Sequence, residues 1–106
     1  MNIFTKAVLK ALPPLGTNAE KEFHEVKVPL KLFNAMGGQS WFITEYDPEE
    51  ELAFGFANLG DDQNAELGYI SIRELKAIKS VHWMLERDRY WEPKTTLDKV
   101  ISFEVR

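Results

Sequence analysis

The stretch Trp41–Phe56, WFITEYDPEEELAFGF, predicts a β-hairpin. Asp47 and Pro48 suit the first two positions of a type I turn, because aspartate accepts onward hydrogen bonds and proline presets the backbone. After the turn, large and small side chains alternate: Leu52, Phe54 and Phe56 against Ala53, Gly55 and Ala57. This period of two is that of a strand, and its small side would let a second layer approach closely. We interpret residues 40–58 as one hairpin.

The same stretch concentrates carboxylates, namely Glu45, Asp47, Glu49, Glu50 and Glu51. Divalent cations bind several carboxylate oxygens, but three consecutive glutamates cannot all converge on one ion, and the spacing fits no EF-hand loop. A hairpin tip is exposed, so we expect its carboxylates to be solvated and to lack the pKa shifts that acid–base catalysis requires. Glu45 and Asp47 remain candidate binding residues, and no metal site is expected.

The flanking sequence extends the hairpin into a sheet. Residues 26–34 alternate, with Val26, Val28, Leu30 and Leu32 on one side and Lys27, Pro29 and Lys31 toward water. Residues 67–71 would add a fourth strand. We predict an α+β fold in which an antiparallel four-stranded meander, with strands at about 26–34, 40–47, 52–58 and 67–71, packs with helices.

Three helices are expected. Apolar residues at spacings of three and four predict an N-terminal helix that ends at Pro13-Pro14. Ser71 and Glu74 have the spacing of a capping box, which predicts a helix near 72–80. Thr95 or Thr96 could cap a short C-terminal helix. The conformation of residues 81–94 stays open.

Length and composition favour one domain. With 106 residues and 44% hydrophobic content, the chain suits a single domain over residues 1–106. No uninterrupted apolar run is long enough for a membrane-spanning helix, and Lys6 and Lys10 interrupt the segment where a secretory signal would lie. The chain has no cysteine, which fits a reducing compartment. We therefore expect a cytoplasmic protein without membrane contact.

Charge is segregated along the chain. The formal net charge is −4, and residues 41–70 hold eight acidic residues and no lysine or arginine. Non-specific duplex binding depends on neutralising many phosphates, so this balance makes nucleic acid a disfavoured partner without excluding it.

Several blocks in fixed order carry a resemblance: LPPL after an amphipathic start, WFITEYDPEEELAFGF, ELGYISIREL and LERDRYWEPK. Together they resemble a family of small bacterial, plasmid and phage proteins known as domain of unknown function 2958, over about residues 3–100. The loop NLGDDQNAELG and the segment SVHWMLERD depart from the family pattern. The resemblance implies a setting, often mobile genetic elements, and no chemistry.

The block ERDRYWEPK, residues 86–94, offers a second candidate site. In an extended conformation Arg87, Arg89 and Trp91 would share one face, and guanidinium groups beside an indole suit phosphate contact and base stacking. The alternative is structural: the arginines pair with nearby carboxylates, and Tyr90 and Trp91 complete the core.

No catalytic motif is present. His24 and His82 accompany neither a zinc-protease motif nor a nucleophile elbow, and no glycine loop has the setting of a phosphate-binding loop, so no cofactor is expected. The preferred hypothesis is a non-enzymatic accessory or interaction protein, from a phage or plasmid, whose acidic hairpin side meets a host protein. The alternatives are a nucleic-acid-binding module or weak nuclease that uses residues 86–94, and a small-ligand enzyme with Glu45 or Glu86 as acid or base.

Overall fold

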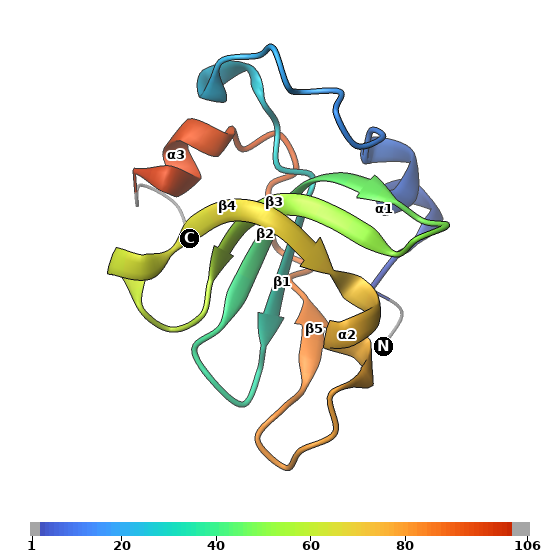
Figure 1. The fold of residues 1–106 in the computed structure, drawn as a ribbon, viewed down its shortest axis with the longest axis vertical. Helices are drawn as coiled ribbons and strands as arrows, with labels where there is room; N and C mark the ends of the chain where they lie inside the picture. The colour runs from blue at the N-terminus through green and yellow to red at the C-terminus, as the bar shows by residue number, and fades with distance from the viewer. Residues whose placement is uncertain (1–2, 103–106) are drawn as a thin grey trace.

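The computed structural model describes residues 3–102, which form an α+β fold around a five-stranded antiparallel sheet of order β4-β3-β2-β1-β5 (Figure 1). The strands are β1 Leu30–Asn34, β2 Ser40–Asp47, β3 Leu52–Asn58, β4 Glu66–Ser71 and β5 Leu85–Arg87. The helices are α1 Lys6–Ala11, α2 Ile72–Ala77 and α3 Leu97–Ile101, with two short 3-10 turns at Phe23–Glu25 and Asp62–Asn64.

The predicted hairpin is confirmed as β2 and β3, and it contains a β-bulge. The pairing runs from Ser40 opposite Asn58 to Asp47 opposite Leu52, and its register shifts by one residue between Ile43 and Glu45. A shift of one residue moves every later side chain to the other face. Glu45 therefore lies opposite Phe54, and Tyr46 lies opposite Ala53 in the core.

Gly55 makes this bulge possible. A Cβ atom at position 55 would lie 2.1 Å from the carbonyl oxygen of Phe42, well inside contact distance. The small side of β3 was expected to admit a second layer. At Gly55 the atoms that approach are instead the backbone of the neighbouring strand.

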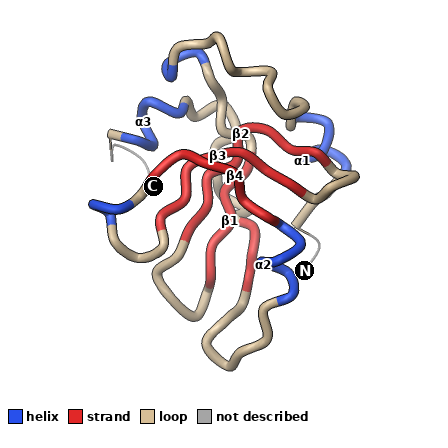
Figure 2. The backbone as a smooth tube through the Cα atoms, in the orientation of Figure 1, coloured by secondary structure: helices blue, strands red, loops and turns tan. Residues whose placement is uncertain are grey.

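Both faces of the sheet are covered (Figure 2). On the first face, Leu30, Leu32, Trp41, Ile43, Ala53 and Ile72 form one buried cluster, against which Val8 of α1 and Leu75 of α2 pack. On the second face, Val26, Val28, Phe42, Phe56, Leu97 and Val100 form another. The first face also takes in Tyr46, which stacks on Phe4 at 4.3 Å between ring centroids, and burial raises the pKa of its hydroxyl.

The prediction for residues 26–34 was wrong in two respects. The strand begins at Leu30, because Val26 and Val28 bond to residues of the 95–97 segment: Val28 N–H donates to Thr95 O and Leu97 N–H donates to Val26 O, both at 2.8 Å. Val26 and Val28 therefore pack on the second face, whereas Leu30 packs on the first. Neither face of the strand is open to water.

The four-strand prediction was also wrong, because β5 pairs with the outer side of β1. Three residues are too few to show a strand period, and the partner lies more than 50 positions earlier in the chain. The order of the four predicted strands is otherwise that of a meander.

All three predicted helices are present, and α2 is shorter than predicted. Ser71 Oγ accepts from Glu74 N–H at 3.2 Å, so the helix starts at Ile72 as expected, but it ends at Ala77 and not near 80. Thr96 is the residue before α3, and its hydroxyl donates to Asp98, which lowers the pKa of that carboxyl.

We predict that Gly55→Ala destabilises the protein by about 3 kcal/mol, because the new methyl group forces β2 and β3 apart at the bulge. The matched control is Gly68→Ala, directly across the ladder from Gly55, where a Cβ atom meets nothing within 4 Å. It should change stability by less than about 1 kcal/mol. Urea unfolding of both variants measures the difference, and equal effects would contradict this account of the bulge.

Candidate functional site

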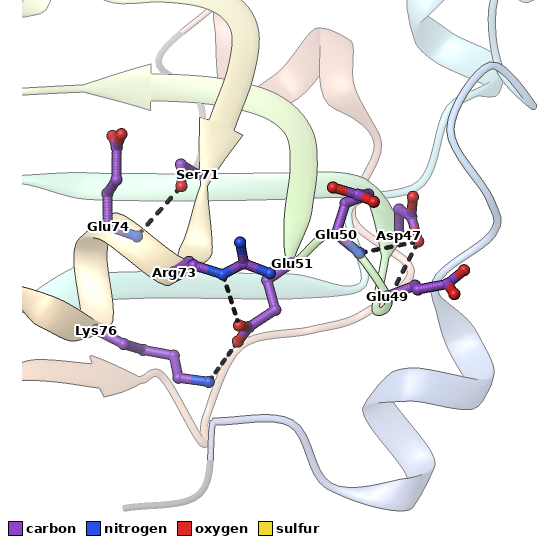
Figure 3. Close-up of polar contacts among 8 residues, drawn as sticks. All are labelled: Asp47, Glu49, Glu50, Glu51, Ser71, Arg73, Glu74 and Lys76. Atoms are coloured by element: carbon purple, nitrogen blue, oxygen red, sulfur yellow. Dashed lines mark hydrogen bonds and ion pairs between the residues drawn. The ribbon is translucent and has the colours of Figure 1, made fainter.

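The tip of the acidic hairpin is a hydrogen-bonded turn (Figure 3). One carboxylate oxygen of Asp47 accepts from Glu49 N–H at 3.0 Å and from Glu50 N–H at 3.5 Å, while the side chains of Glu49 and Glu50 are exposed and point in different directions. The interpretation as a solvated turn is confirmed for these residues.

Glu51 closes the turn and binds α2. Its backbone φ is 50°, in the left-handed region that non-glycine residues adopt uncommonly. Its carboxylate contacts Arg73 Nε at 3.2 Å and Lys76 Nζ at 2.7 Å (Figure 3). These two hydrogen bonds hold the pKa of Glu51 below its usual value.

Glu45 does not belong to the solvated tip, so the expectation of exposure was wrong for this residue. The bulge directs its side chain to the second face, where it is buried. One carboxylate oxygen accepts from Gly16 N–H at 3.0 Å and the other from Asn18 N–H at 2.7 Å. Tyr46 N–H also donates to Pro13 O at 3.0 Å. Residues 13–18 thus lie along the part of β2 that β1 does not reach.

The block 86–94 starts as strand β5 and turns at Asp88. Asp88 N–H donates to Lys31 O at 3.0 Å, and its carboxylate accepts from Tyr90 N–H at 2.9 Å and pairs with Lys31 Nζ at 3.7 Å. Glu86 lies within β5, opposite Phe33. The cavity that Glu45 lines includes no residue of this block, so the structure does not bring Glu45 and Glu86 together.

Trp91 has a structural position. Its indole N–H donates to Val28 O at 2.7 Å, and its ring packs on Phe42 with 5.5 Å between centroids. Lys31 Nζ lies 5.8 Å from the same ring. The arrangement fits the core interpretation of this residue. The structural alternative also placed the neighbouring Tyr90 in the core, and this part of it was wrong, because Tyr90 is 96% exposed.

Arg87, Arg89 and Trp91 do line one surface hollow, of about 200 Å³, together with Pro29 and the side of α1. We expected these three side chains to share a surface because alternate residues of an extended strand lie on one face. They share it instead because the chain turns at Asp88, which folds Arg89 and Trp91 back beside the end of β5.

A second cavity was missed by sequence reasoning. It measures about 270 Å³, lies on the second face beside β4, and is walled by Phe23, Val26, Phe54, Leu67, Tyr69 and Leu97. Phe54 and Tyr69 meet edge to face at 5.3 Å, and Tyr69 is 70% exposed. Alternation could have placed Phe54, Leu67 and Tyr69 on one face, but nothing in the sequence marks Phe23 as its opposite wall.

Within residues 3–102, no group of three histidine, aspartate or glutamate side chains is arranged to hold a metal ion. None of the helices in that range has the length and apolar character needed to cross a bilayer.

A family described as "Protein of unknown function (DUF2958)" matches residues 4–103, nearly the whole chain. The chain belongs to the DUF2958 family. Comparisons with curated proteins and with solved structures gave no match. The resemblance expected from the sequence blocks is therefore confirmed.

We predict that Glu45→Gln lowers the unfolding free energy of the DUF2958 chain by about 2 kcal/mol. A carboxamide keeps one acceptor, but its NH₂ group then faces a backbone N–H, so a charge-assisted hydrogen bond is lost. Glu49→Gln, on the exposed tip of the same hairpin, is the matched control and should change little. Urea unfolding measures both, and a Glu45→Gln variant as stable as the control would rule out a structural role for the carboxylate.

The ion pairs of Glu51 predict a pH dependence. Because its pKa is lowered on folding, its stabilisation is present above the ordinary value of 4.5 and is lost as pH falls below it. The difference in unfolding free energy between wild type and Glu51→Gln should therefore be present at neutral pH and vanish in acid. Glu50→Gln, on the exposed tip of the same hairpin, is the matched control and should change the unfolding free energy little at neutral pH. A Glu51→Gln difference that stays constant from neutral pH into acid would contradict the assignment.

Proposed function

We propose that this DUF2958 chain is a non-enzymatic interaction protein that binds an extended segment of a partner protein along the outer edge of β4. The observation that carries the proposal is the position of β4. It is the last strand of the sheet, in front in Figure 1, and it lies beside the aromatic-walled cavity. Extended peptides commonly bind by adding a strand to such an edge.

The backbone of β4 offers hydrogen bonds in the required direction. Ile72 N–H donates to Glu51 O at 2.9 Å, and antiparallel pairing alternates from there. Ile70, Gly68 and Glu66 therefore bond toward β3, while Leu67 and Tyr69 direct their N–H and C=O groups outward. Among residues 3–102, no strand pairs with this side of β4.

The side chains of Leu67 and Tyr69 would select which partner segment binds. Leu67 and Tyr69 line the cavity with Phe54 and with Phe23, which comes from the 3-10 turn before β1 and is 48% exposed. An added strand places alternate side chains over this face. A large apolar side chain of the partner would fill the cavity and bury the exposed parts of Phe23 and Tyr69.

The charge around β4 indicates which residues of the partner flank its apolar side chain. Asp61, Asp62 and Glu66 are exposed at the start of β4, within the stretch 41–70 that has no lysine or arginine. The complementary partner is a segment that carries lysine or arginine next to its apolar residues.

Two features support a binding role over catalysis at Glu45. Both of its carboxylate oxygens already accept backbone hydrogen bonds, and the cavity it lines is otherwise mainly apolar. We extend the proposal to a cytoplasmic partner from a host cell, since the family resemblance is to proteins often carried by phages and plasmids.

The test is selection of random peptides of about ten residues displayed on phage, with Tyr69→Ala as the matched variant. We expect enriched peptides that alternate apolar and basic residues, and binding about tenfold or more weaker to Tyr69→Ala. Tyr90→Ala removes an equally exposed tyrosine elsewhere and should bind like wild type. Absence of enrichment, or enriched peptides that bind Tyr69→Ala as tightly as wild type, would refute the proposal.

A further inference from the structure

Two neighbouring hollows form one surface on the side of the molecule formed by α1, Pro29 and the 87–94 segment. The first, of about 580 Å³, is lined by Thr17, Lys21, Glu25, Lys27, Thr44 and Lys94, among others. The second, of about 200 Å³, is lined by Arg87, Asp88 and Arg89, among others. Ala11, Pro29 and Pro93 line both, so the two hollows share a ridge.

This surface is strongly cationic although the chain is acidic overall. Its lining includes five cations, Lys21, Lys27, Lys94, Arg87 and Arg89, against the two carboxylates Glu25 and Asp88. Both carboxylates are engaged: Glu25 accepts from Glu22 N–H at 3.0 Å, and Asp88 pairs with Lys31. Glu92 lies nearby and accepts from Lys94 N–H at 3.0 Å.

The lysines of this surface differ from the paired cations elsewhere. Lys31 and Lys76 have carboxylate partners, whereas no carboxylate of residues 3–102 lies at ion-pairing distance from Lys21, Lys27 or Lys94. Exposed ammonium groups around a concave surface attract anions, because the positive field is focused there.

An exposed aromatic residue, Tyr90, lies in sequence between Arg89 and Trp91, which both line the smaller hollow. Tyr90 follows Arg89 at the turn, and its backbone N–H donates to Asp88, which fixes the start of the side chain outside the core. Its side chain is 96% exposed and can stack on a planar ligand, whereas Trp91 is only partly exposed and its ring packs on Phe42.

From this combination we infer that the two hollows bind the sugar–phosphate backbone of single-stranded nucleic acid, with Tyr90 stacking on one base. Single-strand binding proteins join a cationic groove to exposed aromatic rings in this way. A duplex would need a broader positive surface than this chain of net charge −4 provides. Neither hollow includes a residue of β4, although the larger one shares Asn18, Lys21 and Thr44 with the aromatic-walled cavity, so the inference concerns a different ligand surface and goes beyond the proposed function.

The test is titration of the whole chain with a fluorescent mixed-sequence single strand of about 20 nucleotides, as DNA and as RNA, at about 50 and 200 mM salt. Four phosphate contacts, by Lys21, Lys27, Lys94 and Arg89, predict a slope of about −2.8 for log K against log salt. The double variant Lys27→Gln and Lys94→Gln should reduce the slope by about 1.4 and weaken binding about tenfold or more at the lower salt. Tyr90→Ala should weaken binding about fivefold or more at both salt concentrations.

Matched controls make the outcome decisive. Lys79→Gln with Lys99→Gln removes the same charge from exposed positions that line neither hollow, and Tyr69→Ala removes an exposed ring from the edge of β4. Both should bind the strand like wild type.

No saturable binding at the lower salt would overturn the inference, and so would equal losses in the two double-lysine variants. Displacement of the strand by polyglutamate at equal charge would overturn the assignment to nucleic acid in favour of an acidic protein. Since Tyr69→Ala tests the peptide site and Tyr90→Ala tests this one, the two proposals can fail separately.

Discussion

The one-residue bulge in β2 is the constraint on which the arrangement of this fold depends. It exists because Gly55 has no Cβ, so the Phe42 carbonyl can approach the backbone of β3. Because of the register shift, the Tyr46 side chain packs in the core on the first face of the sheet, and the Glu45 side chain lies on the second face. There Glu45 binds Gly16 N–H and Asn18 N–H, which holds the segment from 13 to 18 in place. Asn18 and Lys21 line both the aromatic-walled cavity and the larger hollow, of about 580 Å³. The bulge therefore helps to position one wall of each candidate surface, because it places the carboxylate that holds this segment.

Much of the fold could be predicted from local patterns. The β2–β3 hairpin, the fourth strand and the start of α2 each follow from a period or a cap within a few residues, and the structure has them all. What failed depended on distant parts of the chain. The pairing of Val28 with Thr95, and of β5 with β1, joins segments more than 50 positions apart, and neither segment has a long enough pattern to show it.

The candidate site was less predictable, because it depends on which face a side chain takes. Strict alternation gave no sign of the bulge, so Glu45 was assigned to the solvated tip together with Glu49. In the 86–94 block, Arg87 and Arg89 do share a hollow, but the turn at Asp88 exchanges the roles of the two aromatic residues: Trp91 packs on Phe42, and Tyr90 is exposed. Phe23 and Lys21 come from the loop that follows the Glu45 contacts at Gly16 and Asn18, whereas Lys94 comes from the segment that pairs with Val28, and no local pattern brings these segments together.

The Glu45 carboxylate holds the backbone amides of Gly16 and Asn18, and this contact ties the 13–18 segment to β2. Amide hydrogen exchange of the native protein, followed residue by residue by NMR, tests it most directly. The account predicts that these two amides exchange about as slowly as that of Tyr46, which donates to Pro13 O across the same junction. Exchange of Gly16 and Asn18 at the rate of an unstructured peptide, while the amides of β2 and β3 stay protected, would contradict it.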